Sequence, residues 1–448
     1  MPAIPAPILF VGLLLPPILS FLYASSVLAM YTGFYEWTVA EKMPALLWRF
    51  ALLGGAAAVA YSDRYAGEVG TDLSNASRLT MLVIQSALLW TLSAYFCVET
   101  RLEDVVGGFD PKRGLSTEQP LQGKIILITG SNAGIGKETA KQLATLGATK
   151  IILACRSPKR GQEAMDDLLK ASTNLKASQF MVLQCDLGSF DSIRKAVKTL
   201  EDQKKDIPKI DILILNAGVM MNDHAMTSDG CEAMMQANLL GHYLLTRLLL
   251  DQNIVRPNKQ DPPRVLHLTS STHQIAVVGQ DGMDLDDMFC EKGTRTYTLF
   301  GQYAQSKLGN ILFAKELARR YPRTLVSLAC HPGIVRTDVT RNMPVYLRYP
   351  NIWFGAIVQL MQKTVPQGAW CTVAGALSKV DMEIMSSYEL DVKNFTASQQ
   401  ETNAKTNGNG IPNGSYLQNG KVRPTDLYCY QEAVRVSCFL SLRVCGLL

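Results

Sequence analysis

The sequence predicts an α/β protein with a doubly wound parallel sheet and transmembrane helices ahead of it. Three observations lead to this fold class. Short apolar runs alternate with helical stretches from about residue 124 onward, a glycine-rich turn follows the first run, and long apolar segments occupy the first hundred residues. Strands of a parallel sheet that helices cover on both faces are almost continuously apolar, as these runs are.

The expected elements follow one another in a regular alternation. The predicted strands are 124–129, 150–155, 180–185, 210–215, 265–269 and 325–329. The predicted helices are 137–146, 159–170, 192–200, 233–250 and one around Tyr303. We assign residues 115–385 to this domain and residues 386–448 to a polar, low-complexity tail, whose composition cannot bury a core and predicts disorder. An apolar stretch at 433–448 ends the tail and could dock on the domain or on a membrane.

Residues 1–105 are expected to form up to three transmembrane helices. Residues 7–30 and 79–98 contain no charged side chain, and residues 43–61 carry only Arg49. A bilayer core of about 30 Å needs roughly 20 such residues. A cleaved signal peptide is the rival interpretation of the first segment, although no Lys or Arg precedes Lys42. Buried core helices of a soluble domain are the alternative for the other two.

Composition narrows the class of partner and compartment. The net charge of +5 is spread along the chain without a basic stripe interleaved with aromatic residues, which argues against nucleic-acid binding. The ten cysteines form no CxxC pair, and the five histidines show no metal spacing, so we expect neither disulfides nor a metal site. Free thiols and the Lys/Arg flanks favour a cytosol-facing α/β domain on a membrane, which we expect to be the endoplasmic reticulum.

Chemistry-bearing residues follow the predicted strands one after another. In chain order they are the turn 129–136, Arg156, Asp186 and Leu187, Asn216-Ala217-Gly218, Ser270, and His331-Pro332-Gly333. Ligands of a doubly wound sheet sit beyond the carboxyl ends of its strands. The common location therefore predicts one binding site along this edge.

The turn after the first strand has the composition of a dinucleotide site. Glycines at 130, 134 and 136 let the backbone approach a pyrophosphate at the start of a helix. An NAD site usually has an acid at the end of the second strand, where this chain has Arg156. Because a guanidinium suits a 2′-phosphate, we favour NADP(H) over NAD. A solvated Arg at the start of a loop is the alternative.

Tyr303 and Lys307 are four residues apart on one predicted helix. Their Cβ atoms would be about 5–6 Å apart. An ammonium at that distance lowers the pKa of a phenol, which could then exchange a proton near neutral pH. Together with a dinucleotide site, this pair predicts hydride transfer between a nicotinamide and an alcohol or carbonyl.

These motifs resemble the short-chain dehydrogenase/reductase family over roughly residues 123–379. The motifs are the turn 129–136, Asn216-Ala217-Gly218, Tyr303-x-x-x-Lys307 and Pro332-Gly333. Further segments resemble the retinol-dehydrogenase-like branch: Ala154-Cys155-Arg156-Ser157, Asn238-x-x-Gly241-His242 and Ser270-Ser271-Thr272-His273. Within that branch, Thr272-His273 and Tyr303-Ala304-Gln305-Ser306-Lys307-Leu308 resemble the X-linked group. The resemblance implies a Rossmann fold and a membrane-anchored enzyme of retinoid, isoprenoid or other lipid carbonyls that often prefers NADPH.

The resemblance also implies a role for each matching residue. Tyr303 would be the acid or base, Lys307 would lower its pKa and hold the nicotinamide ribose, Ser270 would orient the substrate oxygen, and Asn238 would hold a water of the proton relay. The cofactor would contact Gly130, Ser131, Asn132, Gly134, Ile135, Gly136, Arg156, Asp186, Leu187, Asn216, Ala217, Gly218, Tyr303, Lys307 and Thr337, with Asp186 and Leu187 at the adenine, Asn216 on the ribose side and Thr337 near the carboxamide. The neighbours Thr269 and Ser271 compete with Ser270 for its role.

Two departures from the family pattern affect the expectations. Tyr303 follows Ser270 by 33 positions, and we interpret the insert at 279–298 as a lid over the substrate cleft. The carboxyl-terminal tail does not resemble the usual end of the family. We therefore expect an NADP(H)-dependent oxidoreductase of a lipophilic alcohol and its aldehyde or ketone, with the oligomeric state open. A steroid or sugar-lipid dehydrogenase, or a catalytically silent nucleotide-binding membrane scaffold, are the alternatives.

Overall fold

The computed structural model describes the α/β part of the chain. The described residues are 119–273, 276, 282–293, 296–333, 335, 363–378, 380–381, 411–413, 415–418 and 421–423. The three predicted membrane segments precede residue 119 and lie outside them. Within the described ranges, no helix combines the length and the apolarity that crossing a bilayer requires.

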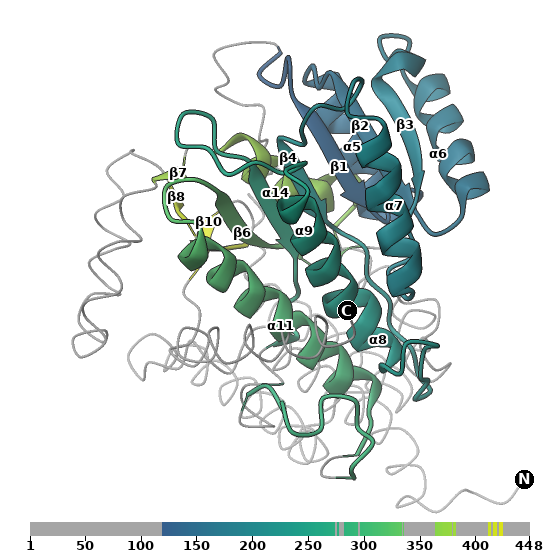
Figure 1. Ribbon diagram of the computed structural model, residues 1–448, viewed down its shortest axis with the longest axis vertical. Coiled ribbons are helices and arrows are strands. Elements are labelled where there is room, and N and C mark those ends of the chain that lie inside the picture. Colours follow the sequence, from purple (N-terminus) through teal and green to yellow (C-terminus); the bar gives the residue numbers. More distant parts are fainter. Residues whose placement is uncertain are drawn as a thin grey trace, which may run out of the picture. The chain divides into compact units, whose positions relative to one another are not determined.

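An eight-stranded sheet forms the centre of this part, in the order β10-β9-β6-β5-β4-β1-β2-β3 (Figure 1). The strands are β1 (Ile125–Thr129), β2 (Lys150–Cys155), β3 (Phe180–Gln184), β4 (Ile212–Leu215), β5 (Arg264–Leu268), β6 (Val326–His331), β9 (Tyr416–Gln418) and β10 (Lys421–Arg423). All neighbours pair in parallel except β10, which pairs antiparallel with β9. The strand order reverses beside β1, which is where such sheets bind ligands.

This sheet confirms the predicted doubly wound arrangement. Each of the six predicted strands forms within two residues of its expected bounds. The pattern was informative because these strands are buried on both faces: all five residues of β1 and all four of β4 are buried. Continuous apolar runs are the signature of such strands.

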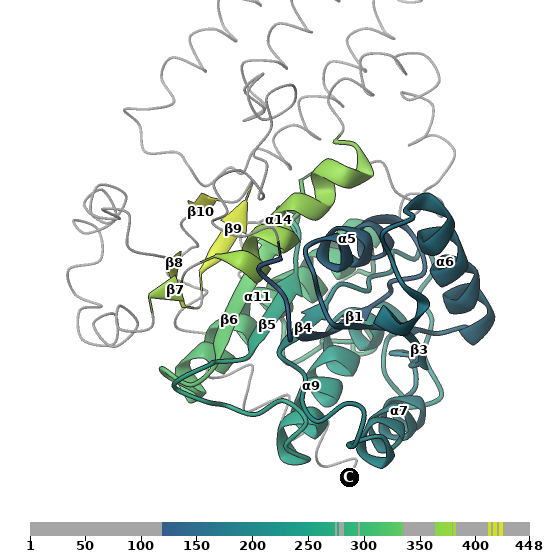
Figure 2. The same cartoon turned by 90° about the horizontal axis from the view of Figure 1, so that it is seen from above.

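Helices cover both faces of the sheet (Figure 2). One face carries α5 (Gly134–Thr145), α6 (Pro158–Ala171) and α14 (Val365–Leu377), and the other carries α7 (Phe190–Asp202), α9 (Gly241–Asp251) and α11 (Leu299–Arg320). Short elements are η1 (Ala177–Gln179), α8 (Ala233–Met235), the π-helical turn η2 (Gln236–Leu240) and the paired strands β7 (Val380–Asp381) and β8 (Ile411–Pro412). Side chains alternate along β1, so Ile126 and Ile128 face α5 while Leu127 joins the opposite core.

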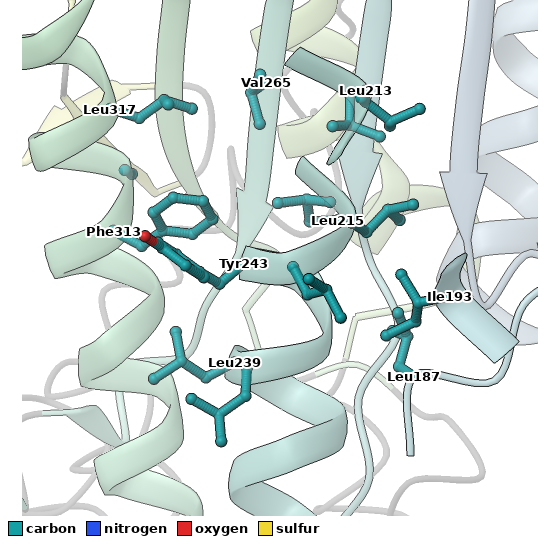
Figure 3. Close-up of a cluster of buried hydrophobic side chains, with 14 of the residues drawn as sticks. Leu187, Ile193, Leu213, Leu215, Leu239, Tyr243, Val265, Phe313 and Leu317 are labelled. Carbon is teal, nitrogen blue, oxygen red and sulfur yellow. The ribbon is translucent and has the colours of Figure 1, made fainter. Parts of the chain in front are cut away.

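The core under α9 and α11 holds the elements that carry the predicted catalytic residues. Leu213 and Leu215 of β4 belong to the same buried cluster as Leu239 of η2 (Figure 3). The rings of Tyr243 and Phe313 pack with centroids 5.2 Å apart and join α9 to α11. Full burial of one such side chain contributes about 1.5–3 kcal/mol, so this cluster fixes η2 and α11 on the sheet.

The predicted end of the α/β domain at residue 385 needs correction. β9 pairs in parallel with β6, from Ala329–Tyr416 to His331–Gln418. Tyr416 is 5 % exposed and Leu417 fully buried, so part of the tail predicted for 386–448 belongs to the core. The polar composition around 402–410 concealed a strand this short, because a three-residue strand leaves almost no periodic signal.

Candidate active site

Close packing of the glycine turn against β4 explains two of its three glycines. A Cβ atom on Gly130 would lie 2.9 Å from Cα of Ala217, and one on Gly136 would lie 2.5 Å from the carbonyl oxygen of Gly130 and collide with the Asn216 amide. Gly130 also has a φ of +64°, which favours glycine. The turn therefore has no room for side chains where the main chain must bend most tightly.

The start of α5 offers unshielded backbone N–H groups. Its N-cap is Ala133, which makes no side-chain capping hydrogen bond, and the first turn holds no acidic residue. The partial positive charge of a helix start favours an anion at this place. Asn132, Gly134 and Ile135 lie around it and are half-buried.

Ser131 departs from its expected role. Its side chain is fully buried and donates to the carbonyl of Ile128 at 3.0 Å, with Cys155 Sγ 3.7 Å away. The hydroxyl therefore supports the turn from below, and only the main chain of Ser131 lies in the turn itself.

Arg156 follows β2 directly and is exposed. The next residue, Ser157, is the N-cap of α6 and accepts from the amide of Arg160 at 3.4 Å. Arg156 therefore stands at the carboxyl edge of the sheet, directly before a helix start.

The residues after β3 divide between surface and core. Asp186 is half-buried and accepts from the amide of Gly188 at 2.9 Å. Leu187 is 6 % exposed and points into the core beside Ile193, as Figure 3 shows. Only the main chain of Leu187 therefore lies at the sheet edge, so the contact with adenine expected for this residue could come from its main chain alone.

The segment after β4 is tied to the end of β1. The hydroxyl of Thr129 accepts from the amides of Asn216 and Ala217 at 2.9 and 3.0 Å, and the Asn216 amide group donates to the Thr129 carbonyl at 2.8 Å. These bonds place the predicted cofactor residues of β1 and β4 side by side. A Cβ on Gly218 would lie 3.3 Å from Lys307 Nζ, so this glycine permits the lysine to approach.

Tyr303 and Lys307 lie one turn apart on α11. Lys307 Nζ is 5.4 Å from the centre of the Tyr303 ring and donates to the carbonyl of Leu268, at the end of β5, at 3.1 Å. Lys307 is 3 % exposed, and burial lowers its pKa to about 8. Tyr303 is half-buried, whereas both its sequence neighbours are buried. The predicted pairing of phenol and ammonium is therefore present on the helix.

Of three neighbouring residues with hydroxyls, Ser270 is the least buried. Thr269 is buried and donates to the carbonyl of Lys307 at 2.8 Å, and Ser271 is also buried. Ser270 is half-buried, and its oxygen accepts from the amide of Thr272 at 3.2 Å. Its hydroxyl hydrogen therefore remains able to reach a substrate oxygen, which favours the register expected for Ser270.

Asn238 uses its whole side chain within the protein. Its Oδ1 accepts from the amide of Val219 at 2.8 Å, and its Nδ2 donates to the Val219 carbonyl and to Ser306 Oγ, both at 3.0 Å. Ser306 in turn donates to the carbonyl of Tyr303 at 2.7 Å. Asn238 thus contacts the Tyr303 helix through Ser306, and its side chain is fully occupied within the protein, so its expected role of holding a water stays a prediction.

Comparison of the chain with known proteins identifies its family. A model of the short chain dehydrogenase family matches residues 124–280. Retinol dehydrogenase 12 of Mus musculus is 37 % identical over 294 residues, which cover 65 % of this chain and 85 % of that protein. The chain belongs to the short-chain dehydrogenase/reductase family.

Further comparisons agree with this family. Retinol dehydrogenase 13 of Homo sapiens is 37 % identical over 263 residues, covering 58 % of this chain and 72 % of that protein. A crystal structure of an uncharacterized protein from Mycobacterium Paratuberculosis has a TM-score of 0.50 at 24 % identity, over 75 % of this chain and 97 % of that one, and shows the fold alone. The expected retinol-dehydrogenase-like branch is confirmed, and with it an enzyme that acts on CH–OH groups. The finer kinship with the X-linked group stays a prediction.

In this short-chain dehydrogenase/reductase, part of the insert predicted to be a lid is docked on α11, the helix that carries Tyr303 and Lys307. Gln305 donates from Nε2 to the carbonyl of Gly282 at 2.8 Å and accepts at Oε1 from the amide of Asp284 at 3.0 Å. Gln302 donates to the carbonyl of Met288 at 3.0 Å. The glutamine amide of residue 305 thereby pairs with the insert as a neighbouring strand would.

The sequence did not predict the structural roles of two buried side chains, those of Thr129 and His242. Thr129 was predicted to end the first strand and open the glycine turn, without a role for its side chain, yet its hydroxyl accepts from the amides of Asn216 and Ala217. His242 was assigned to structure, although it contacts both Thr129 and Asn238. The available signal was a polar residue beside an apolar run: Thr129 ends the run of β1, and His242 precedes the apolar stretch of α9. Thr337 lies outside the described residues, and among those described no group of three or more His, Cys, Asp or Glu could hold a metal.

Proposed function

We propose that the protein is a membrane-anchored, NADP(H)-dependent oxidoreductase that interconverts a lipophilic alcohol, of the retinoid or isoprenoid type, and its aldehyde or ketone. The observation that carries the proposal is the position of Tyr303 beside the buried Lys307, at the strand edge that holds the glycine turn. Membership of a family that acts on CH–OH groups supports the reaction class.

The described residues fit a dinucleotide. The turn packs so tightly at Gly130 and Gly136 that only glycine fits, and α5 begins without a capping side chain. Those N–H groups would hold the pyrophosphate, and Lys307 would hold the nicotinamide ribose hydroxyls. When bound, the nicotinamide supplies or accepts the hydride.

Arg156 is the ground for proposing NADP(H) rather than NAD. It is exposed directly after β2, where dinucleotide folds meet the adenosine ribose. A guanidinium can form two parallel hydrogen bonds with a phosphate, whereas an acid at this place would accept from the 2′-hydroxyl of NAD.

Three side chains would handle the proton and the substrate oxygen. Ser270 would donate a hydrogen bond to the carbonyl oxygen, and Tyr303 would give it the proton as the alkoxide forms. The Lys307 ammonium favours the phenolate that remains. In alcohol oxidation the same atoms act in reverse, with the Tyr303 oxygen as base.

The lipophilic substrate is inferred from two parts of the chain, the apolar amino-terminal segments and the insert before Tyr303. Residues 7–30 and 79–98 are long enough to anchor the protein in a membrane, here assigned to the endoplasmic reticulum with a cytosol-facing domain. The described part of the insert buries Met283, Met288 and Phe289. The insert is bonded to Gln302 and Gln305, which flank Tyr303, so an apolar segment lies close to the proposed proton donor.

The test is a substrate and cofactor panel with the full chain in detergent micelles. NADPH and NADH would each be offered retinal, a polyprenal, a steroid ketone and a water-soluble aldehyde. We expect NADPH oxidation with retinal or polyprenal at a kcat/KM at least tenfold above that with the water-soluble aldehyde. Faster turnover of the steroid ketone would favour a steroid dehydrogenase, and NADPH binding without turnover across the panel would favour a silent scaffold.

A further inference from the structure

We propose that His242 is a positioning residue that couples the cofactor turn to the residues that transfer the proton. This inference rests on the proposed function, because it assigns His242 to the same site. His242 is 1 % exposed at the start of α9 and lies between Thr129 of β1 and Asn238 of η2.

The first contact of His242 is with the main chain of Asn238. Its Nδ1 lies 3.0 Å from the Asn238 carbonyl oxygen. A carbonyl oxygen only accepts, so Nδ1 must carry the hydrogen and donate. Val219 and Ser306 bond the side chain of Asn238, whereas the imidazole bonds its main chain, so His242 fixes Asn238 independently of those two partners.

The second contact is with the hydroxyl of Thr129, whose oxygen lies 2.8 Å from Nε2. Burial keeps the imidazole neutral by lowering its pKa to about 3, so with Nδ1 protonated Nε2 is an acceptor. The single hydroxyl hydrogen of Thr129 then points to Nε2. The carbonyl of Ile214, at 3.4 Å, is the more distant alternative.

The two contacts join what would otherwise be separate networks. On one side, the Thr129 oxygen accepts from the amides of Asn216 and Ala217, beside the glycine turn. On the other, Asn238 reaches Ser306, which donates to the carbonyl of Tyr303. Thr129, Asn238 and His242 are each at most 1 % exposed, so water does not compete for these bonds. Buried hydrogen-bond chains of this kind polarise and orient one another.

A merely packed histidine would not need this orientation. A ring rotated by 180° about its Cβ–Cγ bond would place carbon atoms against the two oxygens, so the observed contacts require one ring orientation and one tautomer. The π-helical turn η2 carries Asn238 in the same stretch, and such turns occur often at functional sites. A shift of the glycine turn would therefore move Thr129, His242 and the Asn238 peptide together.

Two substitutions separate the contacts. Asparagine carries its amide nitrogen near the place of Nδ1, so His242→Asn keeps the bond to Asn238 and loses Thr129. Glutamine reaches toward the place of Nε2, so His242→Gln keeps Thr129 and loses Asn238. A buried neutral hydrogen bond contributes about 1 kcal/mol or somewhat more, which corresponds to roughly a tenfold change.

The measurements are the NADPH dissociation constant, from fluorescence titration, and turnover at saturating NADPH and aldehyde. We expect His242→Asn to weaken NADPH binding about tenfold with turnover within threefold of wild type. His242→Gln should lower turnover about tenfold with NADPH binding within threefold. Thr246→Val is the matched control: it removes the bond from the Thr246 hydroxyl to the carbonyl of His242 at 2.8 Å on the same helix, and should change neither quantity.

Equal effects of both substitutions on both quantities, or none on either, with an active wild type, would overturn the inference, because a structural role cannot separate them. If the wild type binds NADPH but reduces no carbonyl, the proposed function fails. The binding measurement still decides on His242 in that case: weakening by His242→Asn but not by His242→Gln supports the coupling, and any other pattern overturns it.

Discussion

Lys307 Nζ lies 5.4 Å from the centre of the Tyr303 ring, and burial on α11 lowers the pKa of this ammonium to about 8. The carbonyl of Leu268 accepts its hydrogen bond and fixes its position. A lysine at this place has lost most of its hydration, so its field at the phenol is weakly screened. The same burial makes the site sensitive to any anion or hydroxyl that enters beside Lys307.

The uncapped start of α5 leads to a prediction with opposite effects on stability and binding. Ala133 lies at the N-cap with extended backbone angles, φ −158° and ψ 169°, and can accept a capping side chain. Ala133→Asp and Ala133→Asn should each stabilise the cofactor-free protein by about 0.5–2 kcal/mol in urea unfolding. Only the aspartate adds a negative charge where the pyrophosphate would bind.

We therefore expect Ala133→Asp to weaken NADPH binding at least tenfold more than its matched control Ala133→Asn. Titration of intrinsic NADPH fluorescence would measure both. Equal binding by the two variants would show that the start of α5 does not face the phosphates.

Arg156 leads to a prediction on cofactor choice. A charge-assisted hydrogen bond contributes about 1.5–3 kcal/mol, so Arg156→Ala should raise the KM for NADPH about 10- to 100-fold and leave the KM for NADH nearly unchanged. Lys170→Ala, an exposed charge at the far end of α6, is the control and should alter neither. A parallel rise in both KM values would mean that Arg156 does not distinguish the two cofactors.

His267 leads to a prediction on acid stability. It is buried in β5, its Nε2 lies 3.1 Å from Ser327 Oγ, and burial lowers its pKa from 6.5 to about 3. Below pH 6.5 the unfolded chain binds a proton at this residue that the folded chain does not, so stability falls as the pH falls until it approaches the folded value. The slope for one group is about 1.4 kcal/mol per pH unit.

His267→Gln should therefore remove roughly that slope between pH 6 and pH 5 from the free energy of unfolding, although it lowers stability at pH 7. Urea titrations at both pH values measure the difference. An unchanged slope would indicate that His267 is protonated in the folded protein.

Leu417 tests the corrected end of the domain. It is fully buried in β9 and packs in the core on the α5–α14 side of the sheet. Leu417→Ala should cost about 2–5 kcal/mol in urea unfolding. A disordered tail predicts no change, so the same measurement separates the two assignments.

The sequence predicted the fold through features that are local and repeated. Each strand between Ile125 and His331 is mainly apolar, and the glycines at 130, 134 and 136 mark the tight turn after the first strand. It could not predict β9, because Tyr416 and Leu417 form a strand only by pairing with β6, which is distant in the sequence. Nor could it predict the inward side chains of Ser131 and Leu187, since both follow from packing rather than from motif. His242 was missed for the same reason: its partners are 113 and 4 positions away.

The central claim is that Tyr303 exchanges the proton with the substrate. Its most direct test is the single-turnover rate of NADPH oxidation with retinal for Tyr303→Phe, with Tyr243→Phe in the core as the control. Loss of a general acid costs about 10²–10⁴-fold, so we predict a fall of at least 100-fold with NADPH binding within threefold of wild type, and no comparable fall for the control. A Tyr303→Phe variant that turns over as fast as wild type would contradict the account.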